Sequence, residues 1–206
     1  VGMVAVCVQQ VLFCLIALTA SAASAEDTAK VACTTTAGKF TVTLKPSWSP
    51  LGVARFLELV DTNFFSDMLL YRVMSGFLVQ FGVAADSKVQ AKYQEARFKD
   101  EPNQVPFRAG TLSFAGNGVD SRSCHLFVAL EPNGAHLGNA KHETTLGHLD
   151  EEGIETFEQV VENHKAAKYG DTGNLQGALV ARGNKAAAKY PKLDRILQCA
   201  RLKEEL

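Results

Sequence analysis

The sequence has almost no net charge and no grouping of metal-ligating side chains. It contains 21 Lys and Arg against 22 Asp and Glu, which gives a formal net charge of −1. A balance so close to zero provides no general electrostatic attraction for nucleic acid or an anionic membrane. The cysteines and histidines do not fall at the short spacings that hold a metal ion. The composition therefore predicts neither a nucleic-acid partner nor a metal or other cofactor.

Internal repeats, long runs of like charge and low-complexity segments are also missing. Their absence argues against a solenoid, a coiled coil or a disordered tail. Apolar residues make up 47% of the chain, which is ordinary for a globular domain with its own core. A chain of 206 residues then suits a single domain preceded by a targeting segment.

Residues 1–25 carry no charged side chain. The apolar run 11–18 gives way to small residues that end in Ala-Ser-Ala at 23–25. This order is typical of a secretory signal peptide that is cleaved after the last of these alanines. An uncleaved membrane anchor is the alternative, but Gln9-Gln10 and the small residues lower the apolar density and favour cleavage. We expect a mature domain over residues 26–206, without membrane contact once the signal is removed.

The C-terminus supports the same compartment. The last four residues are Lys203-Glu204-Glu205-Leu206, a close variant of the Lys-Asp-Glu-Leu address that returns proteins to the endoplasmic reticulum. A charged C-terminus that arose by chance is the alternative explanation for so short a sequence. Paired with a signal peptide, retrieval becomes the better interpretation. The two ends together predict a protein of the endoplasmic reticulum lumen.

Hydrophobic periodicity predicts many short strands and two amphipathic helices. Alternating residues over 31–36 and 39–44 indicate a hairpin, and Ser49 is suited to cap a helix that begins at Pro50. A second helix is expected over about 154–164. The further expected elements are strands over 70–74, 77–81, 110–114, 125–130, 144–149 and 195–201, a long loop over 82–109 and a short helix near 185–190.

Two polar side chains interrupt an apolar pair of strands. Arg72 lies in the first strand and Gln80 in the second, and a Ser75-Gly76 turn joins them. One explanation is an arginine that extends from a sheet edge into solvent. The other is an arginine that lines an apolar pocket, where its rigid fork of donors can bind a ligand carbonyl or amide.

Three motifs follow one another along the chain. They are Tyr71-Arg72-Val73-Met74-Ser75-Gly76-Phe77-Leu78-Val79-Gln80, then Gly110-Thr111-Leu112-Ser113-Phe114-Ala115-Gly116, then Cys124-His125-Leu126-Phe127-Val128. In this order they resemble the cyclophilins, which are peptidyl-prolyl cis-trans isomerases. The spacing from Ala115 to Phe127 matches the family without a gap, and the resemblance covers roughly residues 32–202. No single motif suffices, so the ordered set carries the identification.

The resemblance implies a mainly β fold, a closed eight-stranded antiparallel barrel capped by two α-helices. Closure would remove the exposed sheet edges that invite aggregation. The first and last strands of this fold adjoin, which would bring Cys33 near Cys199. An oxidising lumen would permit a disulfide between them, and two buried free thiols are the alternative. Cys124 would remain unpaired in either case.

The resemblance also implies the site. Arg72 matches the family's catalytic arginine, which would direct its donors at the prolyl nitrogen and so weaken amide resonance. Gln80 would bond to Arg72 or to the substrate backbone. The side chains expected to bind substrate are Phe77, Leu78, Ala115, Gly116, His125, Phe127, His136 and Leu137. Plain core packing is the alternative for Phe77 and Phe127, as is a solvated loop position for His136.

The implied partners are proline-containing polypeptides and a cyclosporin-type ligand, and we expect a monomer because nothing in the pattern demands a partner surface. The match departs from the family on the substrate side. Gly116 replaces an asparagine, His125 replaces a glutamine, and residues 87–94 replace a glycine-rich loop. Either His142 or Glu143 falls at the family's rim histidine.

We therefore predict a prolyl isomerase of reduced efficiency that assists the folding of secretory-pathway proteins. This prediction rests on Arg72, Gln80 and Phe127, which fall at the matching positions of the family's motifs. The alternative is a module on the same fold that binds proline peptides or a chaperone partner without useful turnover. The altered side chains near the pocket motivate that alternative.

Overall fold

The computed structural model describes residues 28–131 and 137–203. The expected signal peptide, His136 and the last three residues of the retrieval signal lie outside these ranges. Within them, no helix combines the length and the apolar character that crossing a membrane requires.

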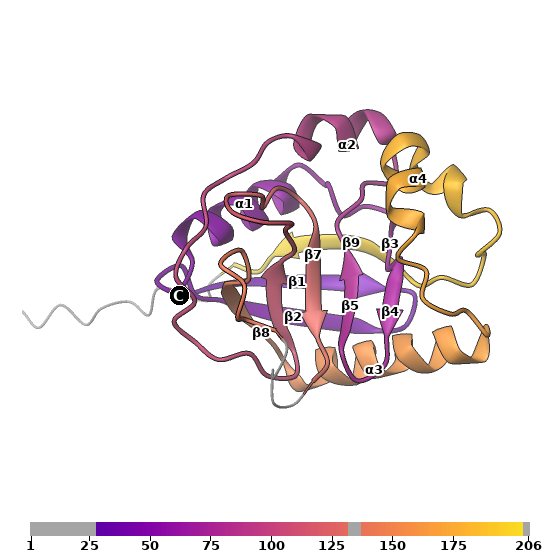
Figure 1. Cartoon of the computed structure of the whole chain (residues 1–206). Helices are drawn as coiled ribbons and strands as arrows, with labels where there is room; N and C mark the ends of the chain where they lie inside the picture. The colour runs from indigo at the N-terminus through magenta and orange to yellow at the C-terminus, as the bar shows by residue number, and fades with distance from the viewer. Residues whose placement is uncertain (1–27, 132–136, 204–206) are drawn as a thin grey trace, which may run out of the picture.

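Nine strands form one antiparallel sheet in the described part of the chain. They are β1 (Ala29–Thr35), β2 (Lys39–Leu44), β3 (Met68–Leu69), β4 (Arg72–Met74), β5 (Leu78–Phe81), β6 (Thr111–Phe114), β7 (Leu126–Ala129), β8 (Thr145–Leu149) and β9 (Arg195–Arg201). Their order across the sheet is β3-β9-β1-β2-β8-β6-β7-β5-β4. In Figure 1, β1, β2 and β9 cross behind β4, β5 and β7, so the sheet curls back on itself.

The closed eight-stranded barrel that we expected is wrong, and the sheet is a nine-stranded half-barrel. The expected strand 70–74 does not run through, because β3 pairs with β9 while β4 pairs with β5. The partner changes at Leu70 and Tyr71, where the Leu70 N–H still donates to the Asp194 carbonyl at 2.9 Å. Strands β3 and β4 are the two end strands of the sheet, although only Leu70 and Tyr71 separate them in the sequence.

Two helices pack against this sheet, as predicted. They are α1 (Pro50–Asp61) and α3 (Glu151–Ala166), and Figure 1 shows them on opposite sides of the curled strands. Phe56 of α1 and Phe157 of α3 are both buried in the main core. Phe40, Val42 and Leu44 enter the same core from alternate positions of β2. Burial of every second residue is what a strand with one face on a core requires.

A distant carboxylate, rather than Ser49, caps the start of α1. The helix begins where predicted, but the Ser49 side chain makes no cap bond. Glu101 accepts from the backbone N–H groups of Leu51 at 2.6 Å and Gly52 at 3.1 Å. Arg122, whose side chain is 0% exposed, pairs with Glu101 at 3.1 Å. Because burying an unpaired carboxylate is costly, Arg122 makes this cap possible.

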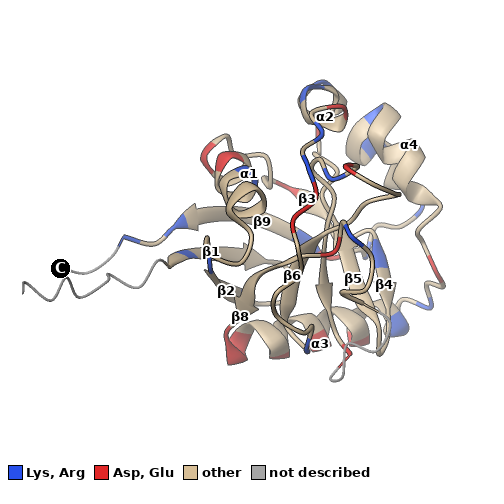
Figure 2. Ribbon diagram, turned by 60° about the vertical axis from the view of Figure 1, so that its left-hand side comes forward, with Lys and Arg blue, Asp and Glu red and all other residues tan. Residues whose placement is uncertain are grey.

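Two shorter helices, which the sequence pattern did not predict, cover one end of the sheet. Helix α2 (Ser87–Gln94) lies within the expected loop 82–109, and α4 (Leu175–Arg182) precedes a 3-10 helix, η1 (Gly183–Ala187), near the expected short helix. Helices α2 and α4 contact each other and lie side by side in Figures 1 and 2. Figure 2 shows Lys and Arg on these two helices and acidic residues on α1 and α3.

Cys33 of β1 and Cys199 of β9 face each other across the sheet and form a disulfide with an S–S distance of 2.00 Å. The structure thus selects the disulfide from the two alternatives that the sequence left open. Cys124 is a buried free thiol, and burial raises its pKa.

The double substitution Cys33→Ser/Cys199→Ser should lower the free energy of unfolding by about 2–4 kcal/mol. The disulfide closes a loop with a sequence separation of 166 residues and so restricts the unfolded chain. Urea denaturation with and without a reductant measures the effect. The reductant should destabilise the wild type and leave the double variant unchanged; a wild type insensitive to the reductant would contradict this account.

Candidate active site

The predicted catalytic and pocket residues lie in one row across the sheet. Arg72 of β4 is directly opposite Gln80 of β5, and Gln80 is directly opposite Phe127 of β7. Phe127 in turn is opposite Ser113 of β6. Residues directly opposite each other in antiparallel strands project from the same face, so the four side chains share one face of the sheet. The structure therefore brings together the residues that the three motifs carry.

The guanidinium of Arg72 is held in place from two directions. Its Nη1 donates to Gln80 Oε1 at 3.2 Å, and its Nε lies 3.4 Å from Asp171 Oδ1. The loop that carries Asp171 is itself attached, because Thr172 Oγ1 donates to the Tyr71 carbonyl at 2.6 Å. The Arg72 side chain remains 30% exposed, and Nη2 has no acceptor within the described ranges. A donor group therefore remains free for a ligand.

An apolar cluster lies beside this row on the same face. Its buried members are Leu78, Phe107, Phe127, Ala129 and Leu137, and Phe77 and Ala115 pack against them while remaining partly exposed. The strand period explains the shared face of three of them. Leu78 precedes Gln80 by two positions, and Ala129 follows Phe127 by two. We refer to these seven residues as the apolar cluster.

Phe107 is the member of the apolar cluster that the sequence did not identify. It lies in the expected loop 82–109, in a segment that shows no strand or helix period. Its ring centroid is 6.0 Å from that of Phe127 in a tilted arrangement. The short apolar run Val105-Pro106-Phe107 was the available signal, and the path of the loop over the sheet could not be foreseen from it.

A polar cavity of about 460 Å³ opens on the other side of Gln80. Its lining includes Gln80, Gln94, Arg97, Ala115, Gly116, Asn117, Ser121, Ser123, His125 and Gln176. The sequence had identified four of these residues as site candidates, and it missed the contributions of α2 and α4. The cavity therefore extends the row of site residues towards the two short helices.

His125 is connected to α2 by a chain of hydrogen bonds. Its Nε2 lies 3.1 Å from Gln94 Oε1, and since that oxygen can only accept, the ring proton is on Nε2. Gln94 Oε1 also accepts from Gln90 Nε2 at 2.8 Å, and Gln90 Oε1 accepts from the Ala84 N–H at 2.8 Å. The two departures from the family, His125 and the helix in place of a glycine-rich loop, are thus structurally coupled.

Gly116 and His142 occupy one small volume. A Cβ atom at Gly116 would lie 2.8 Å from His142 Cγ and 2.7 Å from Ser121 Oγ, so the missing side chain makes room for both neighbours. Glu143 accepts from the Gly138 N–H at 2.7 Å, next to Leu137 of the apolar cluster. His142 therefore lies against Gly116, and Glu143 lies at the Leu137 end of the site.

Burial keeps the site histidine neutral. The His125 side chain is 7% exposed, and burial lowers its pKa to about 4. Burial also raises the pKa of Tyr71, which is 0% exposed. Neither ring carries charge near neutral pH, so the charged neighbour of the Arg72 guanidinium is Asp171 rather than either of these rings.

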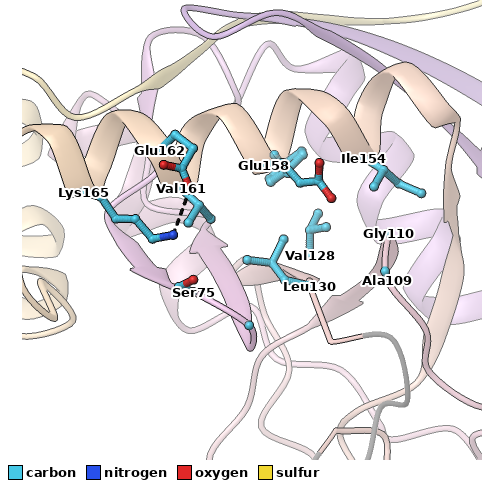
Figure 3. A pocket seen from close by; sticks show the side chains of 12 residues that line it. Ser75, Ala109, Gly110, Val128, Leu130, Ile154, Glu158, Val161, Glu162 and Lys165 are labelled. Carbon is cyan, nitrogen blue, oxygen red and sulfur yellow. Dashed lines mark hydrogen bonds and ion pairs between the residues drawn. The ribbon is translucent and has the colours of Figure 1, made fainter.

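A second cavity, of about 380 Å³, lies beneath α3 and is a separate space. Figure 3 shows Ile154, Glu158 and Val161 of α3 facing Val128 and Leu130 across it. Val128 is the neighbour of Phe127, and successive residues of a strand project to opposite faces. The cavity beneath α3 therefore lies behind the candidate site, and none of the predicted site residues lines it.

The arrangement suits binding and polarisation of an amide rather than bond cleavage. It presents a cation with a free donor, an adjacent apolar surface and a polar cavity. Within the described ranges, no group of three or more His, Cys, Asp or Glu residues is placed to hold a metal ion.

The comparisons with known proteins agree with this geometry. The family model described as "Cyclophilin type peptidyl-prolyl cis-trans isomerase/CLD" matches residues 30–176. That match covers more than half of the chain, and the chain therefore belongs to the cyclophilin family.

Curated relatives are distant. Peptidyl-prolyl isomerase CWC27 of Yarrowia lipolytica is 28% identical over 181 residues, which are 79% of this chain and 48% of that protein. Peptidyl-prolyl cis-trans isomerase B of Bacillus subtilis is 30% identical over 97 residues, which are 45% of this chain and 68% of the relative. The chain thus spans about half the length of the first of these proteins.

A solved structure shares the fold. The crystal structure of a cyclophilin type peptidyl-prolyl cis-trans isomerase of Cryptosporidium parvum superposes with a TM-score of 0.63 at 19% identity, covering 86% of this chain and 99% of that one. A second structure of that protein, in the presence of the dipeptide Ala-Pro, gives a TM-score of 0.61. At this identity the comparison establishes the fold and no more.

Two histidines, His125 (buried) and His148 (half-buried), should make the protein less stable in mild acid. His125 and His148 both have a pKa lowered to about 4, chiefly by burial and for His148 also by the charge of Arg108. In the unfolded chain they bind protons near pH 6.5. Between these values the unfolded state binds more protons, so the free energy of unfolding should fall as the pH drops from about 6.5 to about 4.

Urea denaturation at pH 7 and pH 5 tests this linkage. The double variant His125→Gln/His148→Gln should lose less stability between the two pH values than the wild type. Equal losses in the two proteins would show that these histidines do not carry the effect.

Proposed function

We propose that this protein is a peptidyl-prolyl cis-trans isomerase acting on proline-containing polypeptides. The observation that carries the proposal is the row of Arg72, Gln80 and Phe127 beside the apolar cluster. A proline ring is apolar, and its amide needs a donor rather than a nucleophile. One structure of the Cryptosporidium parvum relative was determined in the presence of Ala-Pro, a dipeptide of this chemical class.

Catalysis in this proposal is stabilisation of a twisted amide. Resonance in the X–Pro bond creates a barrier of roughly 18–20 kcal/mol. A donor from Arg72 that approaches the prolyl nitrogen withdraws its lone pair from resonance and favours the twisted geometry. Gln80 and Asp171 hold the guanidinium, so little reorientation is needed when the substrate binds.

The cluster supplies the other half of the site. Leu78, Phe107 and Phe127 would hold the proline ring, and Leu137 would close the space at one end. Holding the ring while the preceding residue turns confines rotation to the X–Pro bond. The polar cavity next to Gln80 would receive a neighbouring side chain of the substrate.

A binding module without useful turnover is the second candidate. Asp171 already pairs with Arg72 Nε, and the Asp171 side chain is 55% exposed, so a substrate must share the guanidinium with a carboxylate. The altered polar cavity, with His125 bonded to Gln94, points in the same direction. Both features argue for slow turnover, which in the isomerase proposal means a low kcat/KM and in the extreme case gives the binding module.

We also propose that the protein works in the lumen of the endoplasmic reticulum, where it would assist folding of secretory proteins. The support comes from residues 1–25, from the C-terminal Lys-Glu-Glu-Leu and from the Cys33–Cys199 disulfide. Disulfides form and persist in oxidising compartments. Uncatalysed prolyl isomerisation takes about 10–100 s, which makes it a slow step for proteins folding there.

The substitution Arg72→Ala should lower kcat/KM for isomerisation of an Ala-Pro peptide by about 100-fold or more, because it removes the donor directed at the amide. Exchange NMR on the peptide measures the rate. Arg195→Ala removes an arginine of β9 that pairs with Asp67 at 2.9 Å, just before β3, and should leave the rate unchanged. Peptide binding that survives Arg72→Ala, with no exchange gain from the wild type, would favour the binding module.

The localisation is tested in cells by sequencing the N-terminus of the mature protein and by following its secretion. Cleavage after Ala25 and retention inside the cell are expected. Deletion of residues 203–206 should release the protein into the medium. A protein that keeps residues 1–25, or that is retained equally without its last four residues, would contradict this proposal.

A further inference from the structure

Helices α2 and α4 both connect the polar cavity to a second point on the surface. Gln94 at the end of α2 and Gln176 near the start of α4 line the cavity. At their other ends the two helices meet, because the Asn184 N–H donates to the Ala85 carbonyl at 3.0 Å. Gly183 allows this approach, since a Cβ there would lie 2.2 Å from the Ala85 oxygen. The start of α2 therefore lies beside the end of α4, as Figure 1 shows.

Four exposed cations follow these two helices and the 3-10 helix η1. They are Lys88 and Lys92 of α2, Arg182 at the end of α4 and Lys185 of η1. None of them is in an ion pair within the described ranges, and Lys92 only lies over the Tyr93 ring at 4.9 Å. We call these four residues the α2–α4 basic surface.

The nearby carboxylates offset only part of this charge, because residues 86–97 and 175–187 hold five Lys and Arg against two Asp and Glu. Asp86 caps α2 by accepting from the Lys88 N–H at 2.8 Å, and Glu95 pairs with Arg97 at 3.3 Å. Asp67 pairs with Arg195 at 2.9 Å. The whole chain has a formal net charge of −1, so the positive charge here is a local segregation, as Figure 2 shows.

We propose that the α2–α4 basic surface binds an acidic segment of the same polypeptide whose proline occupies the candidate site. This inference rests on the proposed function and names its substrate class. The polar cavity is lined by Gln80, the partner of Arg72, and by Arg97, a cation three residues after the end of α2. A chain that leaves the site through the cavity therefore passes onto the basic surface.

The spacing of the acidic residues follows from the helix length. Each helix has 8 residues and is about 12 Å long at 1.5 Å per residue. An extended chain covers that distance in about three or four residues. Acidic side chains of the substrate should therefore strengthen binding when they occupy about four consecutive positions, beginning next to the substrate residue that lies in the polar cavity.

A polypeptide fits this surface better than a single-stranded nucleic acid. Binding of single strands combines positive charge with aromatic side chains on which bases stack. Tyr93 is the aromatic residue of α2, and it is buried at 2% exposure. Helix α4 contains no aromatic residue.

The experiment compares isomerisation of designed peptides by the full-chain protein using exchange NMR. Each peptide has one Ala-Pro core flanked by four glutamates, or by four glutamines, on either the N-terminal or the C-terminal side. In low salt, kcat/KM for one glutamate peptide should exceed that for its glutamine partner by about tenfold, and the ratio should approach one at high salt. Equal rates for all peptides in low salt would overturn the inference while leaving the isomerase intact.

Charge reversal locates the effect. In Lys88→Glu/Arg182→Glu the ratio of the two rates should fall to about one or below. Lys30→Glu/Lys39→Glu makes the same charge change on the exposed side of the β1–β2 hairpin and should keep the wild-type ratio. An equal fall in both variants would mean that only the net charge matters, which also overturns the inference.

Binding measurements separate this inference from the proposed function. If no peptide is isomerised, the isomerase proposal fails, and titration of the protein with the glutamate and glutamine peptides still reports on the surface. Tighter binding of the glutamate peptide, lost in Lys88→Glu/Arg182→Glu, supports it. A 20-nucleotide single-stranded RNA that binds more tightly than the glutamate peptide, through the same cations, would assign the surface to nucleic acid instead.

Discussion

The register of β4, β5 and β7 is the constraint on which the candidate site depends. It sets Arg72 opposite Gln80 and Gln80 opposite Phe127, and the inner face of the same strands buries Val79 and Val128. Fully burying a valine is worth roughly 1.5–3 kcal/mol, so a slip by one residue would exchange these valines with the polar row at a high cost. The core thus fixes the geometry of a site whose own polar contacts are few.

The departures from the family form one unit rather than a set of independent losses. His125 bonds to Gln94 on α2, and Gln90 attaches the same helix to the backbone of Ala84. The helix that replaces the glycine-rich loop reaches the polar cavity with Gln94 and also carries the exposed Lys88 and Lys92. In the sequence, the changes on the substrate side look like the loss of family residues. In the structure, the changed residues form a polar cavity beside the basic surface.

The strands that hold the site could be predicted because short apolar runs with period two are a local signal, and Arg72 and Gln80 stood out against them. Other features depend on distant residues. Phe107 joins the apolar cluster only through the path of its loop, and Glu101 caps α1 from far along the chain. Helix α2 showed no apolar period, since its buried residues include Gln90. The half-barrel was missed because the change of strand partner after Leu69 depends on β9.

The central claim is that proline binds on the face of Phe127 and not in the cavity behind it. Intermolecular NOEs between an Ala-Pro peptide and the methyl-labelled and aromatic-labelled protein test this directly. The account predicts contacts from the proline ring to Leu78, Phe127 and Leu137. Contacts to Val128 and Val161, in the cavity beneath α3, would place the ligand on the other face of β7 and contradict it.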